Sequence, residues 1–519
     1  MATRVSSASE LQAALKSAAG GDTILLESGN YGQFDLQNLK FDNHVTIKSA
    51  DGNGGARFKH MTIRDSDHIK LDSLTIDFGR PDGDNDKAID IRNAHHVQVV
   101  NSEIIGHAGT QDWSDVARGA EVWQGSSNIE FSDNHFHHFA RAALFLGVSD
   151  ITFNNNRVDD IRFDGIFLGN SRNVRIENNL LTDFYRQGTD HADYIQFDPG
   201  ISGASRDVII RGNVMLKGNG NGDVQGIFGA NHHADLHNSV FTNFLVEDNI
   251  YFDTGLNAIQ FYSGDTMSVR NNTVLADPAD GRVVWVRLHG PQTDSVIENN
   301  VATQVDAEGG ATASGNIIAQ FQDPAQANYY GDLFADPFAD PATLEDLAPK
   351  PGAVGFGSGK GAEERFQELL SGGAPDSSGP GNSEIPVAAD SPAEDAPAVD
   401  GNDPDEDSAD QNGSVPPVFI AEPDASNGKD VVQADTAGDE RNAAPGFEQN
   451  GGKLHLSGEF GDSNGDNVGH VEPIVPGAEK GARGGGIADN LGDVFNDPAA
   501  DGVSYEEPAG SDADGLLLS

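Results

Sequence analysis

The sequence predicts a right-handed parallel β-helix, a stack of coils in which each coil is built from short strands. Two observations lead to this fold class: a recurring asparagine, and strand-like alternation of apolar residues around it. The segments NIEFSDNHF, DITFNNNRV and NVRIENNLL share the pattern apolar-x-apolar-x-x-Asn, which returns through the first two thirds of the chain. Because a repeat of about 20 to 50 residues is typical of solenoids, each repeat is predicted to form one coil.

The asparagines of this pattern are predicted to be structural. They are Asn134, Asn156, Asn179, Asn213, Asn249, Asn272 and Asn300, separated by 22, 23, 34, 36, 23 and 28 residues. Asparagine tolerates the left-handed backbone of a tight bend. Its side-chain amide can also bond to the amides of the coils above and below, so we expect a stacked column at a bend between strands.

The strands themselves are predicted from alternation with a period of two, as in Val174 and Ile176. The third strand of each coil aligns in the segments RGAEVWQG, RAALFLG, DGIFLGN, DYIQFDPG, QGIFGAN and NAIQFYSG. This alignment predicts that Ile166, Ile195, Ile227 and Ile259 point into the coils. On the strand that contains Ile195, it predicts that Tyr194, Gln196 and Asp198 point outward.

The chain is predicted to have two regions. Residues 6–19 form an expected amphipathic helix that closes the first coil, with Ser7 and Glu10 spaced as a capping box. Coils follow from about Phe34 to about Phe321, so residues 1–347 are predicted to be the β-helix domain and to carry the catalytic site. Residues 348–519 are rich in Gly, Pro, Ala, Ser and Asp and are predicted to be a disordered acidic tail.

The charge balance limits the classes of partner. The formal net charge is -50, which disfavours nucleic acid and anionic membranes. The stretch 371–519 contains 31 Asp and Glu against 5 Lys and Arg, a difference of -26, so about half of the net charge lies there. We expect a monomer that binds a polysaccharide and neither nucleic acid nor a membrane.

The two ends of the sequence bear on localisation. The amino-terminal segment has no apolar h-region of a signal peptide, and there are no cysteines. The final segment SDADGLLLS resembles the uncleaved carboxy-terminal signals of type I secreted proteins. We therefore expect an extracellular protein that uses a type I secretion apparatus without a cleavable amino-terminal signal.

Polar residues gather in the segment RQGTDHADYIQFDPG, which contains His191, Asp193, Tyr194, Gln196 and Asp198. This segment lies within the 34-residue asparagine interval, and a 36-residue interval follows. The longer intervals predict longer loops beside a polar strand, and loops on a rigid scaffold commonly carry functional sites. A substrate groove is therefore predicted here.

Four arginines recur shortly before the third strand of successive coils. They are Arg118, Arg141, Arg162 and Arg186. Arginine suits bidentate contacts with carboxylates or sugar substituents, so Arg162 is a candidate catalytic residue and Arg118, Arg141 and Arg186 are candidate substrate-binding residues. The alternative is a ladder of ion pairs with neighbouring aspartates such as Asp164.

These residues also carry a resemblance to a known family. The opening ELQAALKSAAGGDTILLESGNYG, the coil IRFDGI and the string DHADYIQF resemble secreted rhizobial exopolysaccharide glycanases of the succinoglycan-depolymerase type, over roughly Val5 to Val301. The opening is more loosely similar to β-helices of the chondroitinase-B and alginate-lyase type. The resemblance implies depolymerisation of an extracellular polysaccharide, calcium dependence and type I export. The tail has no array of the glycine-aspartate nonapeptides that such relatives carry, which puts a calcium-folded tail in doubt.

Two reactions fit the polar cluster. A glycoside hydrolase needs an acid and a carboxylate, which Asp164, Asp193 and Asp198 can supply. A lyase needs a cation beside the uronate carboxylate, a base and an acid, for which Arg162, Tyr194 and His191 are candidates. The resemblance favours hydrolysis as the first choice.

We thus expect a secreted, endo-acting depolymerase of an acidic or substituted exopolysaccharide. A lyase or C5-epimerase acting on uronic acids is the second hypothesis, and a non-catalytic matrix or adhesion protein is the third. Gln196 and Trp123 are further candidate sugar contacts.

Two groups of residues raise the question of a metal. Asp82, Asp84 and Asp86 alternate in RPDGDNDKA, a spacing that suits calcium, although a solvated acidic turn is the simpler interpretation. The histidines of HFHHF and NHHADLH have no spacing typical of zinc.

Overall fold

The computed structural model describes residues 2–371 apart from short gaps, and two strands farther along the chain. The gaps are residues 53, 80–85, 107–116, 124, 189, 200–202, 230–239, 355–356 and 358, and the two later strands cover residues 447–450 and 453–456. The chain divides into two compact units, residues 1–396 and 397–519.

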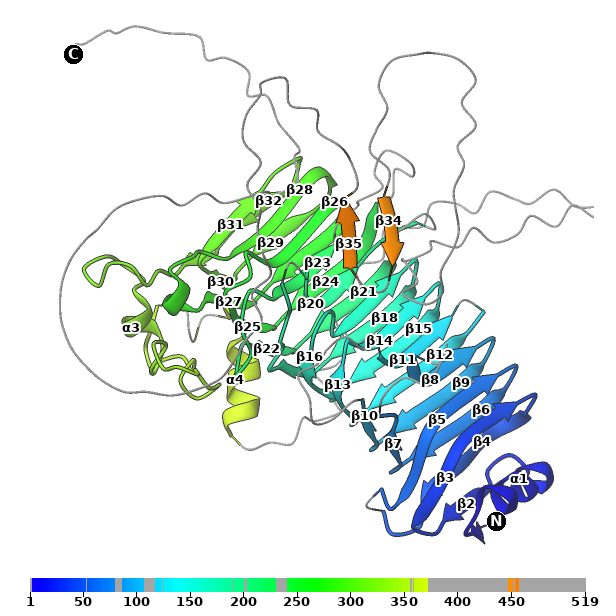
Figure 1. Ribbon diagram of the computed structural model, residues 1–519. Coiled ribbons are helices and arrows are strands. Elements are labelled where there is room, and N and C mark those ends of the chain that lie inside the picture. Colours follow the sequence, from blue (N-terminus) through cyan, green and yellow to red (C-terminus); the bar gives the residue numbers. More distant parts are fainter. Residues whose placement is uncertain are drawn as a thin grey trace, which may run out of the picture. The chain divides into compact units, whose positions relative to one another are not determined.

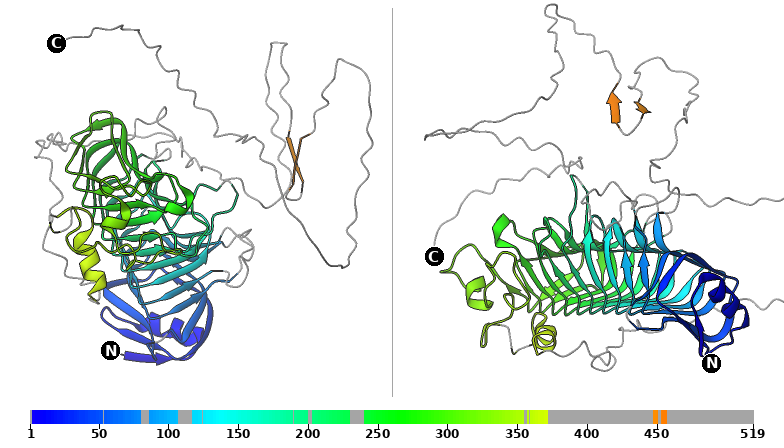
Figure 2. Two further views of the ribbon diagram at one scale, coloured as in Figure 1. Left: turned by 90° about the vertical axis from the view of Figure 1, so that its left-hand side faces the viewer. Right: turned by 60° about the horizontal axis from the view of Figure 1, so that its bottom comes forward.

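The first unit is a parallel β-helix, as predicted. Its described residues form one sheet of 33 strands, and successive coils pair in parallel register (Figure 1). Most coils contribute one strand to each of three walls, whereas β5 runs through both the second and the third wall. Figure 2 shows the coils stacked along one axis from the blue amino-terminal end. Among the described strands, those between the two ends of the stack pair with the coil before and the coil after them, so the unpaired sheet edges lie at the ends.

The strands of the three walls are as follows. The first wall contains β1 (Ala2–Val5), β2 (Thr23–Leu26), β4 (Lys40–Ser49), β6 (Asp67–Asp72), β9 (His95–Val100), β12 (Ser127–Ser132), β15 (Ser149–Asn154), β18 (Arg172–Glu177), β21 (Arg206–Arg211), β24 (Phe241–Glu247), the second half of β26 (Asn257–Arg270), β29 (Val296–Glu298) and β32 (Thr312–Ser314). The second wall contains β7 (Thr75–Asp77), β10 (Glu103–Ile105), β13 (His135–Phe139), β16 (Arg157–Ile161), β19 (Leu180–Thr182), β22 (Val214–Leu216), β25 (Ile250–Asp253), β27 (Thr273–Ala276), β30 (Val301–Ala302) and β33 (Ile317–Ile318). The third wall contains β3 (Gly29–Gln37), β5 (Ala56–Arg64), β8 (Lys87–Arg92), β11 (Arg118–Trp123), β14 (Arg141–Leu146), β17 (Ile166–Gly169), β20 (Asp193–Phe197), β23 (Gln225–Gly229), the first half of β26, β28 (Trp285–Thr293) and β31 (Gln304–Ala307).

The space between the walls is filled by one continuous apolar core. The four isoleucines predicted to point inward are register partners on the third wall and are fully buried. Phenylalanines pack on one another across the core, and the rings of Phe131 and Phe153 in adjacent coils lie 6.1 Å apart. Burial of such side chains contributes about 1.5–3 kcal/mol each, so the stacked core is the main source of stability.

The predicted asparagine column is present and buried. Asn179 shows the arrangement: its Oδ1 accepts from the Nδ2 of Asn156 at 3.1 Å, and its own Nδ2 donates to Oδ1 of Asn213 at 2.9 Å. The same Nδ2 donates to the carbonyl of Phe153 at 2.9 Å. The left-handed residue of the bend is the one before each asparagine, for example Asn178 with φ of 58°. The asparagine was therefore correctly predicted to stack, but its own backbone does not make the left-handed turn.

The amino-terminal helix is the one expected. Helix α1 (Ala8–Ser17) begins at Ser7, whose side chain accepts from the backbone N–H of Glu10, and it buries Leu11 and Leu15 against the first coils. The Glu10 carboxylate accepts from the backbone N–H of Ser6 at 2.7 Å, one residue earlier than a capping box requires. The helix covers apolar residues at the first coil.

Ordered packing continues past residue 347. After the one-turn 3-10 helix η1 (Pro278–Asp280), helices α3 (Tyr330–Leu333) and α4 (Glu363–Leu370) follow the coils. Tyr330 and Phe366 are buried in a second apolar cluster with strands of the second wall. The packed unit thus includes residues beyond the predicted boundary between 347 and 348.

Farther along, β34 (Phe447–Asn450) and β35 (Lys453–Leu456) pair as an antiparallel hairpin. The rest of 372–519, including the final segment SDADGLLLS, lies outside the described residues, so the prediction of a disordered tail remains a prediction. Among the described helices, none has the length and apolarity needed to cross a membrane.

Candidate active site

The candidate site lies on the outer face of the third wall, at the coil that contains β20. Equivalent positions of this wall come into register from coil to coil: Arg118 pairs with Arg141, and Asp193 pairs with Gln225. Gln196 and Asp198 are half-buried on the outer face of this wall. They lie where the alignment predicted them.

Asp164 and Asp193 occupy equivalent positions of adjacent coils. Asp164 precedes β17 by two residues and Asp193 begins β20, since Ile166 pairs with Ile195. The backbone N–H of Asp193 donates to Oδ1 of Asp164 at 3.2 Å, and Oδ2 of Asp164 accepts from Nε of Arg141 at 2.8 Å. The side chains of both aspartates are buried, 1% and 0% exposed. Oδ1 of Asp193 has no hydrogen-bond partner among the described residues.

Gly165 lets these two coils come close together. A Cβ atom at this position would lie 2.6 Å from the carbonyl oxygen of Tyr194, which belongs to the next coil. Only glycine avoids that contact, and its neighbour in sequence is Asp164. The close approach therefore helps to set the spacing between the two aspartates.

His191 is the exposed member of the cluster. Its Nδ1 lies 3.2 Å from Oδ2 of Asp193, and its side chain is 48% exposed. The ring also packs against Phe228 of the next coil at a centroid distance of 4.9 Å. A buried carboxylate thus holds an imidazole whose other nitrogen, Nε2, is directed away from that contact.

The electrostatics of the cluster follow from burial. Burial raises the pKa of Asp193 to about 7, and it also raises the pKa of Asp164, since each carboxylate is removed from water. The hydrogen bond to Asp193 raises the pKa of His191 above its ordinary value. Protonation of the imidazole and of the two carboxylates is therefore coupled.

The four predicted arginines are engaged in ion pairs. Arg118 contacts Asp86 and Glu121, Arg141 contacts Asp164, Arg162 contacts Asp190, and Arg186 contacts Asp223. Only Arg118 and Arg141 are register partners at the start of their strands. The backbone N–H of Arg162 donates instead to the carbonyl of Phe139. Arg162 therefore lies two residues before Asp164 and not at the start of a third-wall strand. The contacts correspond to the ion-pair alternative, in which the arginines neutralise carboxylates.

The prediction that Tyr194 points outward is wrong. Its side chain is fully buried, and its hydroxyl donates to Oδ2 of Asp253 at 2.7 Å. Burial holds the pKa of this phenol well above its ordinary value. The first three residues of β20, Asp193 to Ile195, are all buried, so simple alternation failed at this point. Tyr194 cannot meet a substrate on the outer face, and its proposed role as a base is withdrawn.

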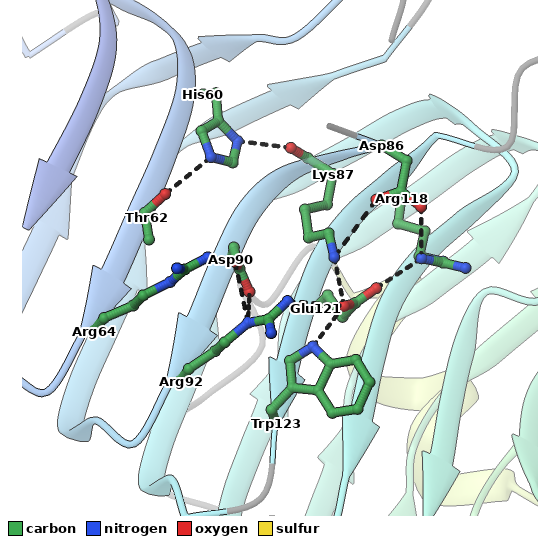
Figure 3. A network of polar contacts seen from close by, with 10 residues as sticks. All are labelled: His60, Thr62, Arg64, Asp86, Lys87, Asp90, Arg92, Arg118, Glu121 and Trp123. Carbon is green, nitrogen blue, oxygen red and sulfur yellow. Dashed lines mark hydrogen bonds and ion pairs between the residues drawn. The ribbon is translucent and has the colours of Figure 1, made fainter. Parts of the chain in front are cut away.

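Trp123 belongs to a polar network on the same wall, several coils closer to the amino terminus (Figure 3). Its Nε1 donates to Oε1 of Glu121 at 2.5 Å, and the Arg92 guanidinium lies 5.1 Å from its ring centroid. Lys87 Nζ contacts the same Glu121 oxygen at 2.6 Å. The indole is half-buried and is held by these contacts.

The predicted calcium ligands are only partly described. Asp82 and Asp84 lie outside the described residues, whereas Asp86 accepts from Arg118 at 2.8 Å and lies 3.5 Å from Lys87 Nζ. Cations of the protein therefore already contact the Asp86 carboxylate. The described contacts give this residue a role in an ion-pair network.

Sequence reasoning missed two acidic residues near the site. Asp190 orients Arg162 through contacts of 2.7 and 3.3 Å, and it could have been noticed because it directly precedes His191. Asp253 lies 59 residues from Tyr194, and burial raises its pKa to about 6. No local pattern links Asp253 to the cluster, because the link depends on which coils stack.

The family model described as the right-handed β-helix region matches residues 19–193. The match covers the amino-terminal coils and ends within the candidate site, at Asp193. A comparison with curated proteins gives no match.

Among solved structures, parts of the chain are similar to three proteins at low identity. An alginate lyase of the PL6 family, AlyGC, is 13% identical with a TM-score of 0.40, covering 63% of this chain and 52% of that chain. The surface adhesin PfbA of Streptococcus pneumoniae is 12% identical with a TM-score of 0.38, covering 59% and 85%. The pectate lyase Pel9A is 13% identical with a TM-score of 0.34, covering 68% and 90%. The chain thus spans about half the length of the alginate lyase, and at these identities the similarity concerns the fold alone.

Proposed function

We propose that this protein is a polysaccharide-degrading enzyme in which His191 transfers a proton at the cleaved linkage. The observation that carries the proposal is an exposed imidazole held by the buried carboxylate of Asp193 on the outer face of a long wall. Histidine is the side chain most often used for proton transfer, because small shifts bring its pKa to the working pH.

The burial of the aspartates favours elimination over hydrolysis by a carboxylate pair. A hydrolase of the two-carboxylate type needs both groups at the sugar, but Asp164 and Asp193 are buried and contacted by Arg141 and His191. In our proposal Asp193 is a positioning residue that fixes the ring of His191. His191 is then the group that takes the proton from the uronate or returns one to the leaving oxygen.

The substrate class is proposed from charge and from the family resemblance. Arg141 and Arg162 flank the ring of Phe163, at 5.2 and 4.7 Å from its centroid. A uronate carboxylate that reached these guanidiniums would compete with Asp164 and Asp190 for them. The resemblance of DHADYIQF to exopolysaccharide glycanases supports an acidic or substituted extracellular polysaccharide as substrate.

Hydrolysis is the second candidate, and Asp198 is the observation in its favour. Asp198 is half-buried just after β20, so it is the accessible carboxylate among the three that the sequence suggested. In that case Asp198 would act on the sugar together with His191. The adhesion hypothesis is the third candidate and requires no chemistry at His191.

The test is to incubate the full chain with a panel of bacterial and algal polysaccharides while following viscosity, reducing ends and ultraviolet absorbance. We expect falling viscosity with rising absorbance from an unsaturated uronate. New reducing ends without absorbance would replace elimination by hydrolysis. His191→Ala should lower the rate by roughly 100- to 10,000-fold, the usual contribution of general acid–base catalysis.

His95→Ala is the matched control, since His95 is a half-buried histidine of the first wall that contacts Ser127 Oγ at 2.8 Å. It should leave the rate unchanged. If no polymer of the panel loses viscosity but one is retained by immobilised protein, with equal retention by His191→Ala, the adhesion hypothesis stands instead. Extracellular export through a type I apparatus, a monomeric state and a calcium requirement remain part of the proposal and are open to separate measurement.

A further inference from the structure

A second group of histidines lies on the outer face of the second wall, away from His191. His135 and His137 alternate on β13, so both point outward while Phe136 between them is buried in the core. Glu103 on β10 is the register partner of His135 in the preceding coil. The sequence spacing of the histidines alone did not suggest a metal, because the third residue comes from another coil.

The potential ligand atoms of these three residues converge. One atom from each of Glu103, His135 and His137 lies within 4.8 Å of the other two. The rings of His135 and His137 stack at a centroid distance of 4.3 Å. Nε2 of His137 lies 3.5 Å from Oε1 of Glu103 and has no hydrogen-bond partner among the described residues.

Neighbouring side chains hold both imidazoles in place. Nδ1 of His137 lies 2.6 Å from Nδ1 of His138, so a proton on His137 Nδ1 leaves the lone pair of Nε2 directed toward Glu103. Nε2 of His135 lies 3.0 Å from Oδ2 of Asp159 in the next coil. Contacts of this kind with outer groups orient histidines that bind metals.

The cluster also has an open approach from solvent. Glu103 and His135 line a depression of about 490 Å³ on the surface. The Glu103 side chain is 46% exposed and that of His135 is 38% exposed. Ligand atoms that bind one zinc ion tetrahedrally through bonds of about 2 Å lie about 3.3 Å from one another, and the exposed Glu103 side chain can rotate toward the two imidazoles.

We propose that Glu103, His135 and His137 form a zinc site, with Asp159 orienting His135 and water completing the coordination. Two imidazoles and one carboxylate are a donor set typical of zinc with an open position. Calcium and magnesium prefer oxygen ligands alone, so they do not match this set. The site is independent of the proposed chemistry at His191.

The experiment is a zinc titration of the full chain, first stripped with a chelator, in competition with a chromophoric zinc indicator. We expect one tight equivalent that excess calcium does not displace. His137→Ala and Glu103→Gln should remove it, and Asp159→Asn should weaken it by roughly 10- to 100-fold. Cobalt substituted for zinc should give visible absorption that depends on His137.

Acidic residues elsewhere also attract cations, so the test depends on comparing zinc binding by the variants with zinc binding by the unaltered chain. All variants keep the acidic stretch 372–519, and His95→Ala is the matched histidine control that should bind zinc like the unaltered chain. Circular dichroism confirms that each variant retains its strands. Equal zinc binding by the unaltered chain and by a folded His137→Ala chain, or displacement of the bound zinc by calcium, would overturn the proposal.

Discussion

The asparagine column and the Asp164–Asp193 pair both place buried polar side chains at matching positions of successive coils. In the column, each amide donates to the next coil and accepts from the one before it, as Asn179 does with Asn213 and Asn156. A carboxylate can only accept unless it is protonated. The aspartate pair therefore needs donors from elsewhere, and Oδ1 of Asp193 has no hydrogen-bond partner in the part of the chain that the structure describes.

This difference separates the asparagine column, which is structural, from the aspartate pair, to which we assign a role in proton transfer. Buried amides satisfy one another and cost little, whereas buried carboxylates raise their own pKa values and take up or release protons near neutral pH. The same spacing between coils thus stabilises the fold in one place and, in the proposed function, positions a group for proton transfer in the other. Three changes would break or sharpen the comparison.

The largest effect is expected when a carboxylate enters the amide column. Asn179→Asp removes both Nδ2 donations, to Asn213 and to the carbonyl of Phe153. Two hydrogen bonds are lost, although Oδ1 of Asn213 keeps the backbone N–H of Asn179, and a buried carboxyl is added. Together these changes should lower the free energy of unfolding by about 2–6 kcal/mol. Urea unfolding followed by circular dichroism measures this loss.

The loss should depend on pH, because burial would raise the pKa of the introduced carboxyl. The added instability appears as pH rises above the unfolded pKa of about 4 and is smallest in acid. The control Asn43→Ala changes an exposed asparagine of β4 and should be neutral. A pH-independent loss would show that charge plays no part in the column.

A smaller effect is expected from widening the gap between the two coils at the aspartate pair. Gly165→Ala places a methyl group against the carbonyl of Tyr194, and such overpacking should cost about 1–3 kcal/mol. The displaced aspartates should also lower the depolymerising rate. Gly29→Ala is the control, since nothing lies within 4 Å of its Cβ position, and a Gly165→Ala chain as active and stable as this control would contradict the role given to the close approach.

The smallest effect on structure is expected from Asp193→Asn, which should instead change the pH dependence of the reaction rate. The amide cannot supply the negative charge that raises the pKa of His191, so the midpoint of the pH–rate profile should move to lower pH. An unchanged midpoint with only a reduced rate would leave Asp193 a purely structural role.

The substitution Asp193→Asn should also change how the stability of the folded chain depends on pH. In the unaltered chain the pKa of Asp193 is about 7 folded, against an ordinary value of 3.8. The folded state therefore loses stability as pH rises from about 4 through about 7. Asp193→Asn should lack this decline, which thermal unfolding at several pH values would detect.

Much of the fold could be predicted because each coil repeats a local pattern. The period of the asparagines predicted the coils, and alternation predicted the inward isoleucines. The orientation of Tyr194 could not be predicted, because three successive residues at the start of β20 are all buried and interrupt the alternation. Local patterns define which residues recur but not where the chain turns between them.

The sequence predicted the segment that contains the candidate site, but not the contacts within it. His191 and Asp193 were found together because they are two residues apart, and their shared segment is polar. The partners Asp223 and Asp253 were missed, since they reach Arg186 and Tyr194 from other coils. The burial of Asp164 and Asp193 also depends on neighbours in space, so their accessibility could not be derived from spacing.

The stacked asparagines have a consequence for how such a surface can evolve. Each amide accepts a neighbour of the same kind on either side, so an additional coil with the same asparagine could be inserted without a new type of contact. Every insertion would lengthen the third wall by one strand spacing, about 4.8 Å. The length of the third wall can therefore change only by whole coils.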